Sequence, residues 1–162
     1  MISSDYIISK RMVDIRIDMD LTQEEMANKL NVRQATYSRW ETATQIIPLV
    51  KLNEFCNLTG YSMDYVMGLC PKDEMVKYKR TILSKEKIGQ NLMIFRLNHN
   101  LFQYQLANFL NTTQSTISAY ENGKTMILTA FAYQIAKEYQ ISMDEFCGRQ
   151  VVESSFKNIV KI

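Results

Sequence analysis

The sequence predicts an all-α protein built from two tandem copies of one five-helix domain. Residues 8–68 align without a gap with residues 88–148, at an offset of 80 positions, and 17 of the 61 aligned pairs are identical. Apolar residues recur at helical spacing in both copies, and no long stretch alternates with the period of two that indicates a strand. We therefore expect a first domain over 1–69, a connector over 70–87, a second domain over 88–148 and a C-terminal tail over 149–162.

Apolar spacing and a capping box mark the first three helices of the first copy. The first helix presents apolar residues at intervals of three or four, namely Ile8, Met12, Ile15 and Met19. Thr22 is placed to cap a second helix that ends near residue 31, with Glu25 as the capping-box partner three positions later. A third helix is expected over 34–41.

A proline, a glycine and a serine mark the boundaries of the last two helices. Pro48 suits the first turn of a fourth helix that runs to about residue 58, and Gly60 suits its C-terminal stop. Ser62 then opens a short fifth helix, and Ser142 repeats this cap in the second copy.

The connector and the tail each carry a short apolar stripe. In the connector we expect an amphipathic helix over 72–83, followed by Ser84 as the cap of the first helix of copy two. In the tail the stripe consists of Phe156, Ile159 and Val160. Each segment either packs on its own domain or joins a second chain, so the sequence leaves a homodimer through the connector or the tail open.

Composition excludes several classes of protein. The chain is 46% hydrophobic with five Gly and two Pro, which is unlike a disordered or collagen-like chain. Its three cysteines form no CxxC pair, so we expect free thiols, no disulfide framework and no metal. The N-terminus lacks the layout of a signal peptide, and no apolar run approaches a membrane span. We expect a cytoplasmic protein without a cofactor and without membrane association.

Residues 22–41, with the sequence TQEEMANKLNVRQATYSRWE, resemble the helix-turn-helix of the phage-repressor family, which is lambda-repressor-like and is also called XRE. Residues 102–124 of the second copy resemble it still more closely, because they end in the Asn-Gly-Lys turn of that family. The resemblance implies two tandem lambda-repressor-like domains. It also implies a sequence-specific transcriptional regulator, repressor-like, whose partner is double-stranded DNA.

Glutamines at matched positions are the leading candidates for DNA contacts. Gln34 and Gln114 begin the third helix of each copy, the end that approaches base edges in this family, and a glutamine amide can pair with adenine. Gln23 and Gln103 begin the second helix, where the family uses the glutamine on a phosphate and to brace its neighbour. The full set of expected DNA contacts is Gln23, Arg33, Gln34, Ala35, Ser38, Arg39, Gln103, Thr113, Gln114, Ser115, Ser118 and Lys124.

Two charged pairs are expected to hold the third helix in place. Arg16 and Glu41, like Arg96 and Glu121, match a pair that the family joins as a buried salt bridge between its first and third helices. Because both partners recur in both copies, a structural bridge is favoured over a loose surface pair.

The copies differ where they would touch DNA. Copy one has Arg33 and Arg39 where copy two has Thr113 and Ala119, and Arg39 suits guanine or a phosphate. Copy one also lacks the Asn-Gly-Lys turn, having Thr-Ala-Thr at 42–44, which weakens the case for a phosphate contact there. We therefore expect the two copies to read different half-sites.

One alternative function stays open, and an enzyme is disfavoured. The chain has no glycine-rich phosphate loop, and its lone histidine, His99, has no catalytic or metal-binding set around it. The alternative is a helix-turn-helix scaffold used for protein contacts, as in an antirepressor, an antitoxin or an inhibitor. Acidic residues near the expected DNA face of copy one favour it, namely Asp18, Asp20, Glu24 and Glu25.

Overall fold

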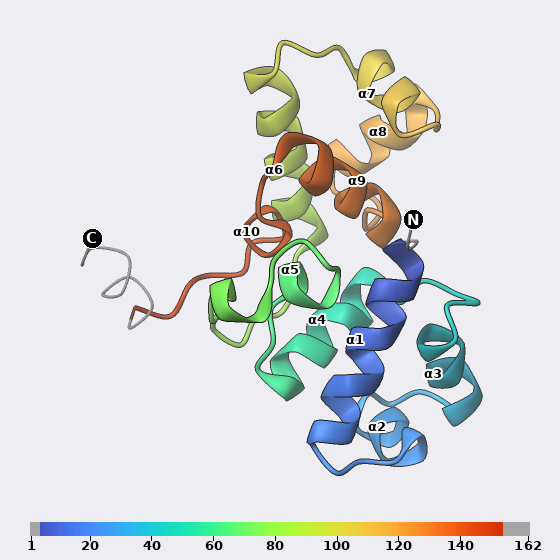
Figure 1. Cartoon of the computed structure of the whole chain (residues 1–162). Helices are drawn as coiled ribbons and strands as arrows, with labels where there is room; N and C mark the ends of the chain where they lie inside the picture. Colours follow the sequence, from blue (N-terminus) through green and yellow to red (C-terminus); the bar gives the residue numbers. More distant parts are fainter. Residues whose placement is uncertain (1–3, 154–162) are drawn as a thin grey trace. The chain divides into compact units, whose positions relative to one another are not determined.

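The computed structural model describes residues 4–153, and these form ten α-helices and one short 3₁₀ helix (Figure 1). No strand occurs among the described residues beyond an isolated antiparallel bridge between Tyr78 and Val151. The chain divides into two compact units. Unit 2 is Lys79–Gln150, and unit 1 comprises the described residues that precede it together with 151–153. The prediction of an all-α tandem repeat is confirmed.

Unit 1 contains five helices in the predicted order. They are α1 (Ser4–Asp18), α2 (Gln23–Lys29), α3 (Gln34–Glu41), α4 (Leu49–Thr59) and α5 (Met63–Val66). The helix α1 packs against α3 and α5, and α2 packs against α3. The core is formed by side chains with almost no exposed surface, among them Met12, Ile15, Met26, Leu30, Tyr37, Leu52 and Phe55.

Unit 2 repeats this arrangement. Its helices are α6 (Lys85–Asn98), α7 (Gln103–Phe109), α8 (Gln114–Glu121), α9 (Thr129–Tyr139) and α10 (Met143–Phe146). The helix α8 packs against both α6 and α7, as α3 does against α1 and α2. The core again consists of aligned apolar positions, among them Ile88, Leu92, Leu106, Leu110, Ile117, Ile135 and Met143.

The predicted helix caps are formed, with one difference between the copies. The Thr22 hydroxyl accepts from the Glu25 backbone N–H, and the Glu25 carboxylate accepts from the Thr22 N–H at 2.8 Å. In unit 2 the equivalent cap is Phe102, which has no hydroxyl. Only the second half of the box therefore remains, in which the Gln105 side chain accepts from the Phe102 N–H at 2.8 Å. Ser62, Ser84 and Ser142 cap their helices as expected.

The prediction of a helix over 72–83 is wrong. Only Lys72–Glu74 is helical, as the 3₁₀ helix η1, and the segment that follows is not. The backbone there pairs with a distant part of the chain. In unit 1 the Val152 N–H donates to the Lys77 carbonyl at 3.0 Å, and in unit 2 the Lys79 N–H donates to the Gln150 carbonyl at 2.7 Å. Because these groups find partners outside the segment, a helix is not needed to satisfy them.

Each copy has a non-glycine residue in a left-handed conformation where the other copy has glycine. Ala43 has φ 58° after α3, and its counterpart after α8 is Gly123, with φ 67°. Gln140 has φ 53° after α9, and its counterpart after α4 is Gly60, with φ 79°. The left-handed region is unfavourable for an alanine, which has a Cβ and no polar side chain to compensate. Ala43 is therefore a strained position in unit 1.

We expect Ala43→Gly to raise the free energy of unfolding of unit 1 by about 0.5–1 kcal/mol. The relief of the left-handed alanine is worth about 1–2 kcal/mol, and the greater freedom of glycine in the unfolded chain offsets part of it. Urea unfolding followed through the single tryptophan, Trp40, measures this unit. The control Ala35→Gly, within α3, should lower stability by up to about 1 kcal/mol. Equal destabilisation by both variants would show that Ala43 is not strained.

Candidate nucleic-acid interface

A helix-turn-helix occurs once in each unit, formed by α2 and α3 and by α7 and α8. The turns rely on Asn31 and Asn111, which adopt left-handed conformations with φ 55° and 54°. Asparagine tolerates this region better than most residues. Ala27 and Ala107, in the second helix of each unit, are buried, so a larger side chain at either position would disturb the packing around it. The geometry of the pair is thus determined by small and turn-forming residues at matched positions.

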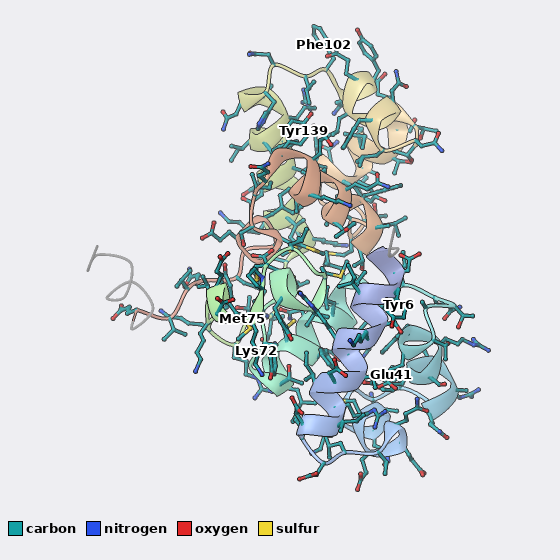
Figure 2. The ribbon with its side chains drawn as sticks, in the orientation of Figure 1. Tyr6, Glu41, Lys72, Met75, Phe102 and Tyr139 are labelled. Atoms are coloured by element: carbon teal, nitrogen blue, oxygen red, sulfur yellow. The ribbon has the colours of Figure 1, made fainter. Side chains whose placement is uncertain are left out.

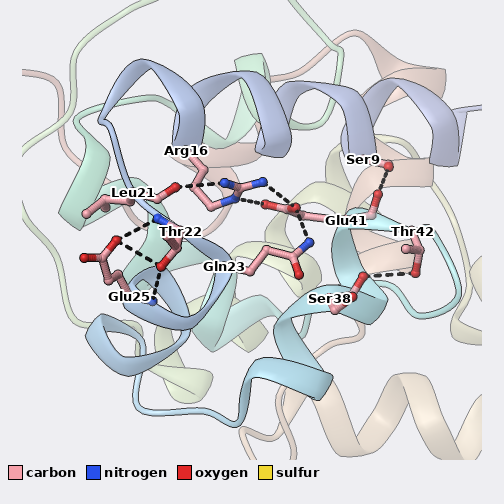
Figure 3. Close-up of polar contacts among 9 residues, drawn as sticks. All are labelled: Ser9, Arg16, Leu21, Thr22, Gln23, Glu25, Ser38, Glu41 and Thr42. Carbon is pink, nitrogen blue, oxygen red and sulfur yellow. Dashed lines mark hydrogen bonds and ion pairs between the residues drawn. The ribbon is translucent and has the colours of Figure 1, made fainter.

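A buried carboxylate ties the third helix of each unit to the first, and Figure 3 shows the one in unit 1. Arg16 Nε lies 2.7 Å from Glu41 Oε1 and Arg16 Nη2 lies 3.1 Å from Oε2. The same two distances are 2.5 and 3.1 Å between Arg96 and Glu121. The glutamate side chains are only 3% and 4% exposed. Each pair is therefore a two-pronged, shielded ion pair.

The glutamine that begins the second helix completes this arrangement. Gln23 Nε2 donates to Glu41 Oε2 at 2.8 Å, and Gln103 Nε2 donates to Glu121 Oε2 at 2.9 Å. We refer to each set of arginine, glutamate and glutamine as a brace. A glutamine Nε2 carries two protons, so one remains for a ligand after the first is donated to the carboxylate. Three helices of each unit meet at the brace.

Charge is maintained in the brace of unit 1. Burial alone would raise the pKa of Glu41, but hydrogen bonds from Arg16 and Gln23 outweigh it and hold that pKa below its ordinary value. The hydrogen bond to Glu41 raises the pKa of Arg16. The Tyr37 hydroxyl lies in the same region, is buried, and is without a hydrogen-bond partner among the described residues. Burial and the Glu41 carboxylate raise the pKa of Tyr37.

The first turn of α3 and of α8 is open to solvent. Gln34 and Ala35 in unit 1, and Gln114 and Ser115 in unit 2, are all exposed. Arg39 is exposed one to two turns further along α3, and Ser38 and Ser118 are partly exposed. These residues thus lie on the surface that α3 and α8 present away from their cores.

In unit 2 the candidate residues converge on one open hollow of about 430 Å³. Five of its six lining residues are among the expected contacts, namely Gln103, Gln114, Ser115, Ser118 and Lys124. The sixth is Ala119, which the sequence did not single out as a contact. Thr113 does not line the hollow. Its hydroxyl accepts from the Thr116 N–H at 3.2 Å and caps α8 instead. In unit 1 the counterpart Arg33 occupies the cap position without such a bond, so its guanidinium is not used there.

The turn after the third helix also differs between the units. In unit 1 the hydroxyl oxygens of Thr42 and Thr44 lie 2.7 Å apart, and each lies within hydrogen-bond distance of a carbonyl at the end of α3. In unit 2 the Asn122 side chain donates to the Ser118 carbonyl at 2.8 Å, and Lys124 is left exposed beside the hollow. A basic side chain is therefore available after α8 and is missing after α3.

The surface next to the second helix differs in charge and polarity between the two units. In unit 1, Asp18, Asp20 and Glu24 are exposed. In unit 2 the counterpart of Glu24 is Tyr104, whose ring stacks on that of Phe102 with 5.8 Å between centroids. Phe102 is 65% exposed and projects from the unit (Figure 2). One surface is acidic and the other is neutral and aromatic.

Neither a metal-binding cluster nor a membrane-spanning helix is found in the part of the chain that the structure describes. Within residues 4–153 no three His, Cys, Asp or Glu side chains lie together as a metal site would require. Within the same range no helix has the length and apolar character needed to cross a membrane.

Comparisons with known proteins point to one family. The profile of the helix-turn-helix family HTH_3 matches the chain twice, at residues 14–66 and 92–146. Among solved structures, a transcriptional regulator from Listeria innocua is similar at 26% identity. The match covers 45% of this chain and 71% of that one, with a TM-score of 0.37. No protein of curated function matches.

We expect Glu121→Ala to destabilise unit 2 by about 3 kcal/mol, because it leaves the shielded Arg96 guanidinium without its carboxylate. The control Glu138→Ala removes an exposed carboxylate of α9 and should change stability by less than about 0.5 kcal/mol. Urea unfolding followed by far-ultraviolet circular dichroism compares the two. If both variants unfold at the same urea concentration, the brace does not stabilise the fold.

Proposed function

Because the chain belongs to the helix-turn-helix family HTH_3, we propose that it is a repressor-like transcriptional regulator that binds double-stranded DNA through both units. The observation that carries this proposal is the convergence in unit 2. The glutamine that starts α8, the glutamine of the brace, two serines and a lysine line one hollow beside an exposed helix end. That set combines groups for base edges with groups for phosphates.

Under this proposal α3 and α8 are recognition helices that enter the major groove. Gln34 and Gln114 reach base edges from the first turn, where a glutamine amide both donates to and accepts from adenine. Small neighbours help, because a bulky side chain at Ala35 or Ser115 would hold the helix away from the groove. Gln23 and Gln103 offer their remaining proton to a phosphate.

The two recognition helices read different bases. Arg39 on α3 is exposed and suits guanine, whereas its counterpart Ala119 on α8 suits the methyl group of thymine. Lys124 adds a phosphate contact in unit 2, and Arg33 adds positive charge in unit 1. The proposed operator is therefore asymmetric, with one half-site for each unit.

A second candidate function is supported by the surfaces beside α2 and α7. Exposed carboxylates at Asp18, Asp20 and Glu24 repel a phosphate backbone, and the exposed Phe102 and Tyr104 suit a protein partner. On this reading the scaffold serves protein contacts, as in an antirepressor or an antitoxin. Dimerisation through the tail belongs to either candidate, but its stripe of Phe156, Ile159 and Val160 lies outside the described residues.

We expect Gln34→Ala or Gln114→Ala to cost about 1–3 kcal/mol on the preferred duplex and to relax base choice at one position. In vitro selection from a random duplex library gives the preferred site, and fluorescence anisotropy at several salt concentrations gives affinities. The control Gln134→Ala, an exposed glutamine of α9, should leave both unchanged. Affinity for random duplex should fall steeply with salt. Absence of any salt-dependent binding would favour the protein-contact candidate, and equal losses on preferred and random duplexes would mean that these glutamines do not read sequence.

We also expect each unit to contribute separately to one site in the intact chain. Both units belong to one chain, so the second recognition helix does not depend on a partner subunit to reach an adjacent half-site roughly 34 Å away. Tethering raises the local concentration of the second unit toward about millimolar, so loss of either unit should weaken binding by at least tenfold. Footprints of the double variants Gln34→Ala/Arg39→Ala and Gln114→Ala/Lys124→Ala test this. Each should lose protection over one half-site only. If a double variant leaves the footprint unchanged, the altered unit does not bind this DNA site and has another function.

A further inference from the structure

Unit 2 has a second open hollow, formed by α6 and by residues at and around α10. Its volume is about 290 Å³. Phe95 and Phe146, which are both buried, supply aromatic surface, and Ile94 and Ile141 supply aliphatic surface. The exposed carboxylate of Glu145 lies at its edge. No residue of this hollow belongs to the surface proposed to bind DNA.

The equivalent place in unit 1 is occupied by the chain's own side chains. The Arg11 guanidinium lies 4.3 Å from the centroid of the Tyr65 ring and donates to the Cys70 carbonyl at 2.9 Å. The Tyr65 ring stacks on the Tyr61 ring at 5.2 Å, and the Lys72 ammonium lies 5.8 Å from the Tyr61 centroid. Cations and stacked rings therefore fill this region of unit 1.

Three substitutions between the copies remove these groups from unit 2. At the offset of 80, Arg11 becomes Asn91, Tyr61 becomes Ile141 and Tyr65 becomes Glu145. Asn91 is shorter and donates to the Phe146 carbonyl at 2.9 Å, so it lies along the wall of the hollow. The Glu145 carboxylate has no ion-pair partner among the residues from 4 to 153. The same fold thus has space and an unpaired negative charge where unit 1 has a cation and two rings.

We propose that this hollow binds a small organic cation, a planar amidinium or guanidinium on an apolar body. The carboxylate of Glu145 accepts charge-assisted hydrogen bonds from such a group, and the body packs between Ile94, Ile141 and the two phenyl rings. The ligand provides the cation and the planar ring that Arg11 and Tyr65 provide within unit 1. A volume of about 290 Å³ is at the lower end for small-molecule sites, which limits the ligand to about the size of one substituted ring. This site does not depend on the proposed binding of DNA.

His99 provides a direct readout, because it lines the hollow and is the single histidine of the chain. Its ring lies 4.4 Å from that of Phe95 and 4.7 Å from that of Tyr139, measured between centroids. We would titrate the full-length, isotope-labelled protein with benzamidine and follow the His99 ring signals by NMR. The expected result is a saturable shift with a dissociation constant of about 1 mM.

Matched ligands and variants separate this site from general apolar binding. Benzamide, which has the same shape without the charge, should bind at least tenfold more weakly. Glu145→Gln should weaken benzamidine about tenfold, whereas Glu138→Gln, an equal charge change on α9, should stay within twofold. The triple variant Asn91→Arg/Ile141→Tyr/Glu145→Tyr introduces the unit 1 side chains and should abolish the saturable shift. Amide spectra confirm that each variant is folded. A shift that does not saturate by about 10 mM, or equal binding of benzamide and benzamidine, would overturn the proposal.

Discussion

The position of each third helix depends on one buried carboxylate at its last residue. Glu41 and Glu121 each accept two bonds from an arginine of the first helix and one from the glutamine that opens the second helix. A carboxylate this shielded is stable only while its cation is present, so the three helices are held in a single arrangement. The bonds are directional, whereas apolar contacts alone would let α3 or α8 rotate. The face that α3 or α8 turns outward is therefore set by chemistry inside the unit.

The glutamine of the brace links this interior to the surface. Gln23 and Gln103 are only partly exposed, and each has one amide proton on the carboxylate. Under the proposed function the other proton meets a phosphate, so a contact with the DNA backbone also bears on the carboxylate that orients the recognition helix. Positioning on the duplex and orientation of the reading helix are thereby coupled through one side chain.

Much of the fold follows from the sequence because its signals are local and occur twice. Capping residues such as Thr22 and Ser62 act within one turn. Because the domain is repeated, a cap or an apolar pattern found in one copy can be checked at the aligned positions of the other. The connector helix was mispredicted because residues 77–79 pair with residues 150–152, and a contact between segments so distant leaves no local pattern. The candidate contacts were partly obscured for a related reason. The Thr113 hydroxyl caps α8 and is therefore not directed to a ligand. The hollow lined by Glu145 arises because side chains there are smaller than those of unit 1, and the periodicity of a sequence does not reveal such a space.

The brace is conserved between two copies that differ at 44 of their 61 aligned positions, buried positions such as Tyr37 and Ile117 included. The brace residues are identical in both units, while the outward surfaces have changed in charge, because hydrated side chains carry little of the folding free energy. In unit 1, Arg39, Asp20 and Glu24 are all exposed. Under the proposed function, these exposed carboxylates disfavour loose association with a duplex, since many poses bring a carboxylate against a phosphate. A pose with α3 deep in the groove gains the arginine contact, which offsets the repulsion that unspecific poses suffer without compensation. Under the proposed function, the acidic residues of unit 1 therefore lower its general affinity for duplex DNA and raise its selectivity.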